Sequence, residues 1–405
     1  MNLEIDTREI IHALSSSLDL VGVDEVYHGS RVAFMALQCG QTLGLDSDLL
    51  DTLHHAALLH DCGVSSTTVH RNLVTELDWS HSQLHCERGS NLLRTTNLLA
   101  DLAPIVRYHH THWDELPKDI DQHTSILCNI IYLTDRVDAL MAQHFENDYL
   151  LAGNSTKKII KKYSGTFFSP EVVDAYLEVS ASEFFWMALD PRHLTTYLQK
   201  MIASPQKQMI NGDTVLEIAA IFADIVDAKS PFTVQHSLGV AMLARYLGTL
   251  CDLDNDTLLQ LQVSGLLHDL GKLNIPDEIL EKPGPLTGRE QLIMKQHSFE
   301  SYQILNKING FESIAQWSAF HHETLCGQGY PFHIHNFGLC LEARIIAVAD
   351  IFQALAQDRP YRNALDPNKI LAIMNKMAQE NKIDPGLVVL IQDNLEECLL
   401  QAQCG

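Results

Sequence analysis

The segment AALLHDCG at residues 56–63 returns as SGLLHDLG at residues 264–271, with the same adjacent His-Asp pair in both. A second pair of segments agrees in the same way: IIYLTDRVDALMA at 130–142 and IIAVADIFQALAQ at 345–357. Similarity repeated in the same order along one chain is typical of duplicated structural units. The sequence therefore predicts a tandem duplication.

Histidines and aspartates recur in one order in both halves. The first histidine precedes the His-Asp pair by 32 residues in each (60 − 28 and 268 − 236), and a later histidine precedes a His-His pair by 24 (109 − 85 and 321 − 297). The N-terminal series is His28, His60, Asp61, His85, His109, His110 and Asp135. The C-terminal series is His236, His268, Asp269, His297, His321, His322 and Asp350. Chance does not readily supply this ordering.

These residue types suit a metal centre. Neutral imidazoles and carboxylates are natural ligands for iron, manganese and zinc. In an adjacent His-Asp pair the carboxylate can bridge two metals while the imidazole binds one. A single histidine on an apolar helix face is usually a core or surface residue, and a lone His-His pair is a common accident. The repeated series favours metal binding over those alternatives.

Charge and composition limit the function. The chain has 28 basic and 51 acidic residues, a formal net charge of −23, so it repels long nucleic acids. A small anionic ligand fits if bound cations reverse the local sign. Apolar runs fall short of the ~18 residues of a membrane helix, and the polar N-terminus is unlike a signal peptide. Scattered cysteines without CxxC suit a reducing compartment, so we expect a cytoplasmic protein without a membrane partner.

Apolar residues recur at three- and four-residue spacing, as in VLEIAAIFADIVDA (215–228). This periodicity predicts an all-α chain of two tandem helical bundle domains. The polar segment SPQKQMINGD (204–213) is the clearest break, which gives domains at residues 1–205 and 206–405. We expect Asp213 or Thr214 to cap the helix that starts at Val215.

Four segments resemble the HD-GYP family: GLLHDLGKLNIPDEIL (265–280), MKQHSFESYQIL (294–305), HHETLCGQGYP (321–331) and ARIIAVADIFQALAQDRPYR (343–362). The resemblance covers residues 209–405. It implies a helical bundle with two or three metals that hydrolyses cyclic di-GMP or 3′,3′-cyclic GMP-AMP to a linear 5′-phosphorylated dinucleotide. It also implies contacts of the GYP loop, residues 327–331, with signalling proteins. A homodimer is the default expectation for the oligomeric state.

The resemblance assigns roles to individual residues. It makes the whole C-terminal series metal ligands, for iron or manganese in particular. Phe232 stands where members with a third metal have a glutamate, so we expect two divalent ions. Lys272 and Asp269 are the expected catalytic residues, with the lysine steadying charge on the phosphate. The alternative for Lys272 is a solvated lysine at a helix end.

The resemblance also places Tyr330, Arg359 and Arg362 at the substrate. Tyr330 offers a ring or a hydroxyl, and each arginine can make bidentate contacts with phosphate or a guanine edge. A structural turn and a surface arginine pair are the alternatives. Departures from the family pattern, none at a ligand position, are Gly239, Gln353 and Ser298. They put the choice between the two cyclic dinucleotides in doubt.

The N-terminal half resembles the broader HD phosphohydrolase superfamily. Val64 stands at the position of Lys272, and GYP and RPYR have no counterparts. Two interpretations stay open for this half: a decayed duplicate with a sensory or dimerising role, or a second metal site that removes the 5′ phosphate of the linear product. For the whole chain, the rivals are a general nucleotide phosphohydrolase and a non-catalytic module that binds cyclic dinucleotides.

Overall fold

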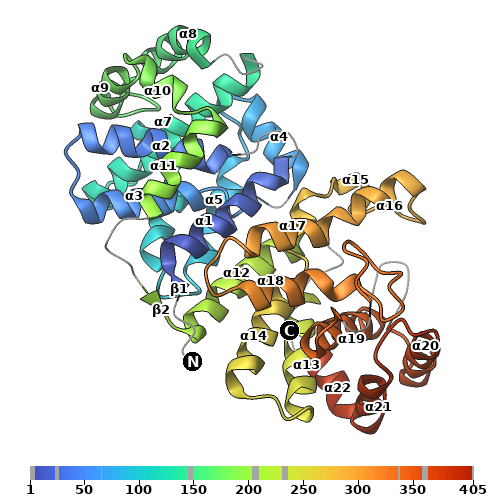
Figure 1. The fold of residues 1–405 in the computed structure, drawn as a ribbon. Coiled ribbons are helices and arrows are strands. Elements are labelled where there is room, and N and C mark those ends of the chain that lie inside the picture. Colours follow the sequence, from blue (N-terminus) through green and yellow to red (C-terminus); the bar gives the residue numbers. More distant parts are fainter. Residues whose placement is uncertain are drawn as a thin grey trace. The chain divides into compact units, whose positions relative to one another are not determined.

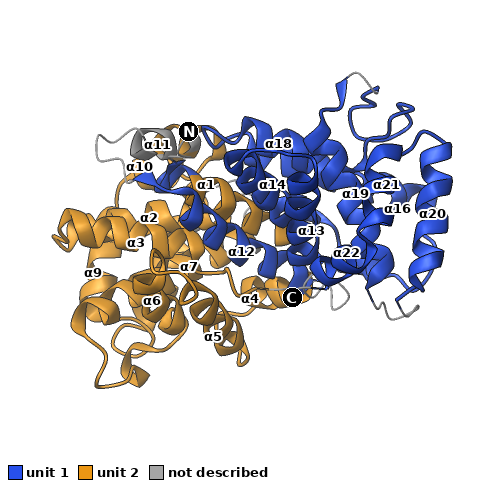
Figure 2. Cartoon of the chain, turned by 90° about the horizontal axis from the view of Figure 1, so that it is seen from below, with its two compact units in different colours: residues 1–9, 209–405 blue, residues 10–208 orange. Residues whose placement is uncertain are grey.

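The computed structural model describes residues 5–22, 27–64, 66–144, 149–202, 209–229, 236–335, 338–357 and 364–403. The chain divides into two units, coloured separately in Figure 2: residues 10–208, and residues 209–405 together with the first nine. Strand β1 (Ile5–Asp6) belongs to the second unit because it pairs antiparallel with β2 (Met209–Ile210). The predicted boundary between residues 205 and 206 lies outside the described residues.

Helices make up nearly all the regular structure of the described residues, which confirms the predicted all-α class (Figure 1). Beyond the β1–β2 ladder, these ranges hold one isolated bridge, between Ser164 and Phe168. In the same ranges, no helix combines the length and apolar character needed to cross a membrane.

The unit of residues 10–208 is organised around the long helix α7 (Gln122–His144), against which α2, α4, α6 and α8 pack. Its buried Ile130, Ile131 and Leu133 supply core contacts next to the polar residues that the site uses. The remaining helices are α1 (Thr7–Leu18), η1 (Asp19–Gly22), α2 (His28–Thr42), α3 (Ser47–Leu59), α4 (Thr67–Thr75), α5 (Ser82–Leu93), η2 (Ala100–Leu102), α6 (Ala103–Tyr108), η3 (Trp113–Glu115), α8 (Tyr149–Lys162), α9 (Pro170–Val179), α10 (Glu183–Met187) and α11 (Pro191–Ile202).

The second unit has its core between α13 (His236–Leu250) and α19 (Leu341–Ala356). Val240 and Leu247 of α13 are fully buried in one cluster with Phe352 of α19. The other helices are α12 (Gly212–Lys229), α14 (Asn255–Leu267), η4 (Leu270–Asn274), α15 (Asp277–Leu280), α16 (Gly288–Met294), α17 (Gln296–Leu305), α18 (Glu312–Ala319), η5 (Phe320–His322), α20 (Pro367–Gln379), α21 (Pro385–Asp393) and α22 (Leu395–Ala402).

The two units repeat the elements that carry the histidines. Helices α2 and α13 have 15 residues each, and each begins at the first histidine of its series. Helices α3 and α14 have 13 residues each and end immediately before the His-Asp pair. Asp46 caps α3 and Asp254 caps α14, each through a carboxylate that accepts a backbone N–H three residues on. Equal helix lengths explain the equal spacings seen in the sequence.

The predicted cap of α12 is wrong. The helix begins at Gly212, three residues before Val215, so Asp213 and Thr214 already lie inside it. The side-chain oxygen of Asn211 accepts the backbone N–H of Thr214 at 3.0 Å, as an N-cap asparagine does. The apolar pattern marked the first buried residue, whereas the backbone turns into the helix earlier.

Candidate metal centres

The C-terminal series converges on the carboxylate of Asp269. Its Oδ2 lies 3.2 Å from His268 Nε2 and 3.6 Å from His236 Nε2. Its Oδ1 lies 3.6 Å from His297 Nε2 and 3.9 Å from His321 Nε2. One carboxylate thus turns an oxygen toward each of two groups of imidazoles, the arrangement that a bridge between two cations requires.

The remaining two ligand candidates complete these groups. Asp350, on α19, joins the group of His236 and His268, with its Oδ1 3.4 Å from His236 Nε2. His322 joins the group of His297 and His321. The structure therefore brings the whole predicted C-terminal series together from α13, α17, η5, α19 and the junction between α14 and η4.

Backbone carbonyls fix the orientation of three imidazoles. The Nδ1 atoms of His268, His297 and His321 lie 2.7, 2.6 and 2.5 Å from the carbonyl oxygens of the residues three positions earlier. A carbonyl accepts from the protonated nitrogen, so Nδ1 carries the hydrogen and Nε2 is left with its lone pair. In each of these rings Nε2 is the atom that faces Asp269.

Burial and neighbouring charges set the protonation states of the C-terminal cluster, and these bear on whether it can bind cations. Burial lowers the pKa of His297 to about 3 and that of His322 to about 4, so both imidazoles are neutral at pH 7. Burial opposes ionisation of Asp269, yet His268 and Lys272 hold the pKa of that carboxyl well below its usual range. His268 Nε2 and Asp269 Oδ1 are buried without a hydrogen-bond partner. Against burial, hydrogen bonds to Asp269 and Asp350 raise the pKa of His236 to about 10, so a cation bound there would displace a proton. The neutral rings of His297 and His322 and the ionised Asp269 with an unused acceptor atom fit divalent metals directly.

The glycine of each HDxG motif lets the backbones of two ligand-bearing segments touch. A Cβ built at Gly271 would overlap the carbonyl oxygen of His297, and one built at Gly63 would overlap that of His85. A larger residue would therefore push the third histidine away from the aspartate that it faces.

Lys272 lies at the edge of the C-terminal cluster on η4. Its Nζ is 2.5 Å from Asp269 Oδ2, and its side chain keeps 20% of its surface exposed. The lysine therefore borders both the candidate ligands and solvent. Lys272 also lies in the last turn of η4, so the alternative of a lysine at a helix end stays open.

The GYP loop is tied to the cluster by two side chains. The Tyr330 ring lies 4.7 Å from the His322 ring, and Lys295 Nζ lies 5.1 Å from the tyrosine ring centre. Glu323 is buried, and its carboxylate accepts the backbone N–H groups of Phe332, His333 and Ile334, which directly follow the GYP loop. Sequence reasoning assigned no role to Glu323, although it directly follows His321 and His322 in the quoted segment.

Some predicted positions lie outside the described residues. These are Arg359, Arg362 and Phe232. Gln353, which the sequence marked only as a departure from the family pattern, contacts a ligand candidate: its Oε1 is 2.5 Å from Nδ1 of His236. The two residues are 117 positions apart, so sequence spacing held no signal for this contact.

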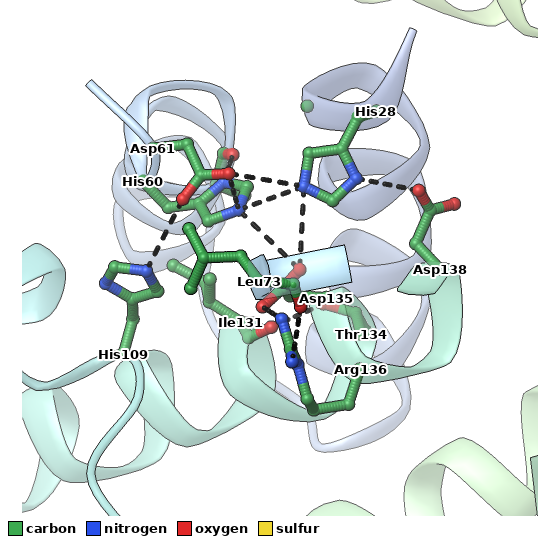
Figure 3. A network of polar contacts seen from close by, with 12 residues as sticks. His28, His60, Asp61, Leu73, His109, Ile131, Thr134, Asp135, Arg136 and Asp138 are labelled. Carbon is green, nitrogen blue, oxygen red and sulfur yellow. Dashed lines mark hydrogen bonds and ion pairs between the residues drawn. The ribbon is translucent and has the colours of Figure 1, made fainter. Parts of the chain in front are cut away.

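The N-terminal series converges in the same way, as Figure 3 shows for part of it. Asp61 Oδ2 lies 3.6 Å from both His28 Nε2 and His60 Nε2, and its Oδ1 lies 3.3 Å from His85 Nε2. Asp135 contacts His28 Nε2 at 3.5 Å and His110 Nε2 at 3.4 Å. His109 Nε2 completes the set, 3.9 Å from Asp61 Oδ1. Asp61 Oδ1 has no hydrogen-bond partner, so the same fit to divalent metals holds here.

The N-terminal cluster also has a positively charged side chain beside it, but at a different position from that of Lys272. Val64 replaces the lysine, and Arg136, fully buried on α7, donates instead to Asp135 at 2.8 Å. Arg136 also donates to the carbonyl oxygens of Leu73 and Glu76, at 2.9 and 2.8 Å, which attaches α4 to α7. Arg136 is thus buried against the candidate ligand Asp135, whereas Lys272 keeps part of its side chain exposed to solvent.

Two helical units, each with histidines gathered around the aspartate of a His-Asp pair, define an HD-domain protein. A family model described as "HD domain" matches residues 26–140, and another of the same description matches residues 220–387. Each match spans one of the clusters.

Three known proteins refine this assignment. The 3′3′-cGAMP-specific phosphodiesterase 1 of Vibrio cholerae is 34% identical over 98% of this chain and 94% of its own. The cyclic di-GMP phosphodiesterase response regulator RpfG of Xanthomonas campestris is 37% identical over 47% of this chain and 50% of its own. A crystal structure of a cyclic GMP-AMP-specific phosphodiesterase of V. cholerae, V-cGAP3, matches with a TM-score of 0.67 and 25% identity over 98% of both chains. The chain belongs to the HD-GYP family of cyclic dinucleotide phosphodiesterases.

Proposed function

We propose that the C-terminal cluster hydrolyses 3′,3′-cyclic GMP-AMP to its linear 5′-phosphorylated dinucleotide. The observation that carries this proposal is the placement of Asp269, which faces both groups of imidazoles while Lys272 borders it from the solvent side. The choice of the hybrid dinucleotide rests on similarity along both units to the V. cholerae cGAMP-specific enzyme, whereas the cyclic di-GMP enzyme matches less than half of the chain.

The C-terminal side chains have separable tasks in this reaction. His236, His268, Asp269, His297, His321, His322 and Asp350 would hold two divalent ions, for which we propose iron or manganese. Bound cations of this kind supply an activated water and neutralise phosphate charge. Lys272 offers its ammonium group to a non-bridging phosphate oxygen, which is worth most where charge accumulates in the transition state. Tyr330, packed on His322, presents a ring face and a hydroxyl to the sugar or base.

The direct test is chromatographic product analysis with protein loaded with Mn²⁺ or Fe²⁺. Cyclic di-GMP and 3′,3′-cyclic GMP-AMP are supplied separately, and His268→Ala plus Asp269→Ala is the control. We expect faster hydrolysis of the hybrid dinucleotide and none by the control variant. Equal or faster turnover of cyclic di-GMP would overturn the substrate assignment. Binding of either dinucleotide without turnover at full metal occupancy would refute the proposal that the C-terminal cluster catalyses hydrolysis.

We also propose that the N-terminal cluster binds divalent metal and removes the 5′ phosphate from the linear product. The complete gathering of His28, His60, Asp61, His85, His109, His110 and Asp135 supports a working site over a decayed duplicate. The absence of a lysine at Val64 supports a reaction different from that of the C-terminal site. His60→Ala plus Asp61→Ala should leave cleavage of the cyclic dinucleotide intact and abolish release of inorganic phosphate. Unchanged phosphate release would refute this assignment.

A further inference from the structure

The first histidine of each series is held differently from most of the other ligand candidates. The Nδ1 atoms of His60, His109, His268, His297 and His321 all contact backbone carbonyl oxygens. By contrast, His28 Nδ1 lies 2.7 Å from Asp138 Oδ2, and His236 Nδ1 lies 2.5 Å from Gln353 Oε1. A side-chain acceptor can change by substitution, whereas a backbone carbonyl cannot. The orientation of His28 and His236 is therefore set by residues outside the ligand series.

In the N-terminal unit the acceptor is one half of a buried ion pair. Arg31, three residues after His28 on α2, donates to Asp138 through Nε at 2.6 Å and through Nη2 at 2.8 Å. The Asp138 side chain has no exposed surface, and that of Arg31 is 9% exposed. Figure 3 shows Asp138 on the outer side of the His28 ring, away from Asp61. The guanidinium of Arg31 therefore holds the carboxylate of Asp138 in place, and that carboxylate sets the orientation of the His28 ring.

In the C-terminal unit both members of this pair are replaced together. Position 239, three residues after His236, is glycine, and the residue equivalent to Asp138 is Gln353. A Cβ at Gly239 would overlap the carbonyl oxygen of Ala402 and approach Gln353 Cγ to 3.0 Å. The end of α22 thus fills the space that an arginine would need. A carboxylate at position 353 would have no guanidinium beside it to neutralise its charge. The side-chain amide of Gln353 is neutral and needs no such partner.

From this contrast we propose that each unit has its own two-residue device that positions the first metal-ligand histidine. The device is Asp138 with Arg31 in the N-terminal unit and Gln353 with Gly239 in the C-terminal unit. One device can replace the other only if both of its residues are exchanged together. Each device accepts the Nδ1 hydrogen and leaves the Nε2 lone pair directed at the cluster. Asp138, Arg31 and Gln353 are positioning residues that act through His28 and His236. This inference rests on the proposed metal binding of both clusters and adds residues that belong to neither ligand series.

The test measures Mn²⁺ affinity in the full-length protein, with one cluster disabled at a time. In a His268→Ala plus Asp269→Ala background, bound Mn²⁺ reports the N-terminal cluster. Asp138→Asn should weaken Mn²⁺ binding about 10- to 100-fold, the usual effect of losing the partner of a ligand histidine. Arg31→Met combined with Asp138→Gln recreates a neutral acceptor without a buried lone charge, and it should restore most of the lost affinity. Asp174→Asn, an exposed change on α9, is the matched control.

The reciprocal background, His60→Ala plus Asp61→Ala, isolates the C-terminal cluster. There, Gln353→Leu should weaken Mn²⁺ binding to a similar extent, with thermal unfolding confirming that each variant is folded. Affinities unchanged by Asp138→Asn and Gln353→Leu would overturn the positioning role, as would a double variant no better than Asp138→Asn alone. A background protein that binds no Mn²⁺ at its intact cluster would instead refute the proposed metal function of that cluster.

Discussion

Glu323 offers a direct test of how the GYP loop is held against the C-terminal cluster. Its Oε1 accepts the N–H groups of Phe332 at 2.6 Å and His333 at 3.0 Å, and its Oε2 accepts that of Ile334 at 3.0 Å. Glu323→Gln keeps an oxygen for two of these donors but turns an NH₂ group toward the third. A hydrogen bond to a charged group contributes about 1.5–3 kcal/mol, so the free energy of unfolding should fall by about 2 kcal/mol.

A loss of that size is measurable by calorimetry. For a unit of this length, 1 kcal/mol shifts Tm by about 2–4 °C, so Glu323→Gln should lower the Tm of the C-terminal unit by about 4–8 °C. Protein treated with a chelator is used, because bound metal would add its own stabilisation. Glu281→Gln removes a charge from an exposed position and is the control. A Glu323→Gln protein that melts within a degree of the parent would refute the view that this carboxylate holds the loop.

Three further predictions address charge, metal and pH. Lys272→Met should lower kcat about 10²- to 10³-fold, as loss of a transition-state charge partner does, with Mn²⁺ content unchanged by elemental analysis. Mn²⁺ at 100 times its Kd should stabilise the fold by about 2.7 kcal/mol for each ion bound and raise Tm by roughly 5–10 °C per ion, reversibly on chelation. Burial lowers the pKa of Lys229 to about 8 from 10.5. Between pH 8 and pH 10.5 Lys229 is therefore protonated in the unfolded chain and largely neutral in the folded one. Because the unfolded chain binds more protons in this range, the contribution of Lys229 to stability rises from pH 8 to pH 10.5. The stability of Lys229→Met relative to the parent should accordingly fall by up to about 3 kcal/mol over this range in urea unfolding; a constant difference would contradict it.

Much of the candidate site could be predicted from the sequence because its ligands belong to repeated local elements. Helices of 15 and 13 residues separate the first histidine from the His-Asp pair in both units, so the spacing of 32 residues survives in the chain. Helical periodicity likewise predicted the all-α class correctly. The cap of α12 was placed wrongly, because apolar periodicity reports buried positions and not the residue at which the backbone turns.

The sequence by itself determined the duplication, the identity of the ligand candidates and the chemistry that imidazoles and carboxylates offer to cations. Only the tertiary structure decided what holds those ligands. His28 meets Asp138 across 110 residues, and His236 meets Gln353 across 117. The tertiary structure also assigned β1 to the second unit and showed that Glu323 accepts a hydrogen bond from the backbone next to the GYP loop. The physical reason is that such contacts depend on how separate helices pack, and packing is fixed by side-chain volumes throughout a unit, not by the residues on either side of a motif.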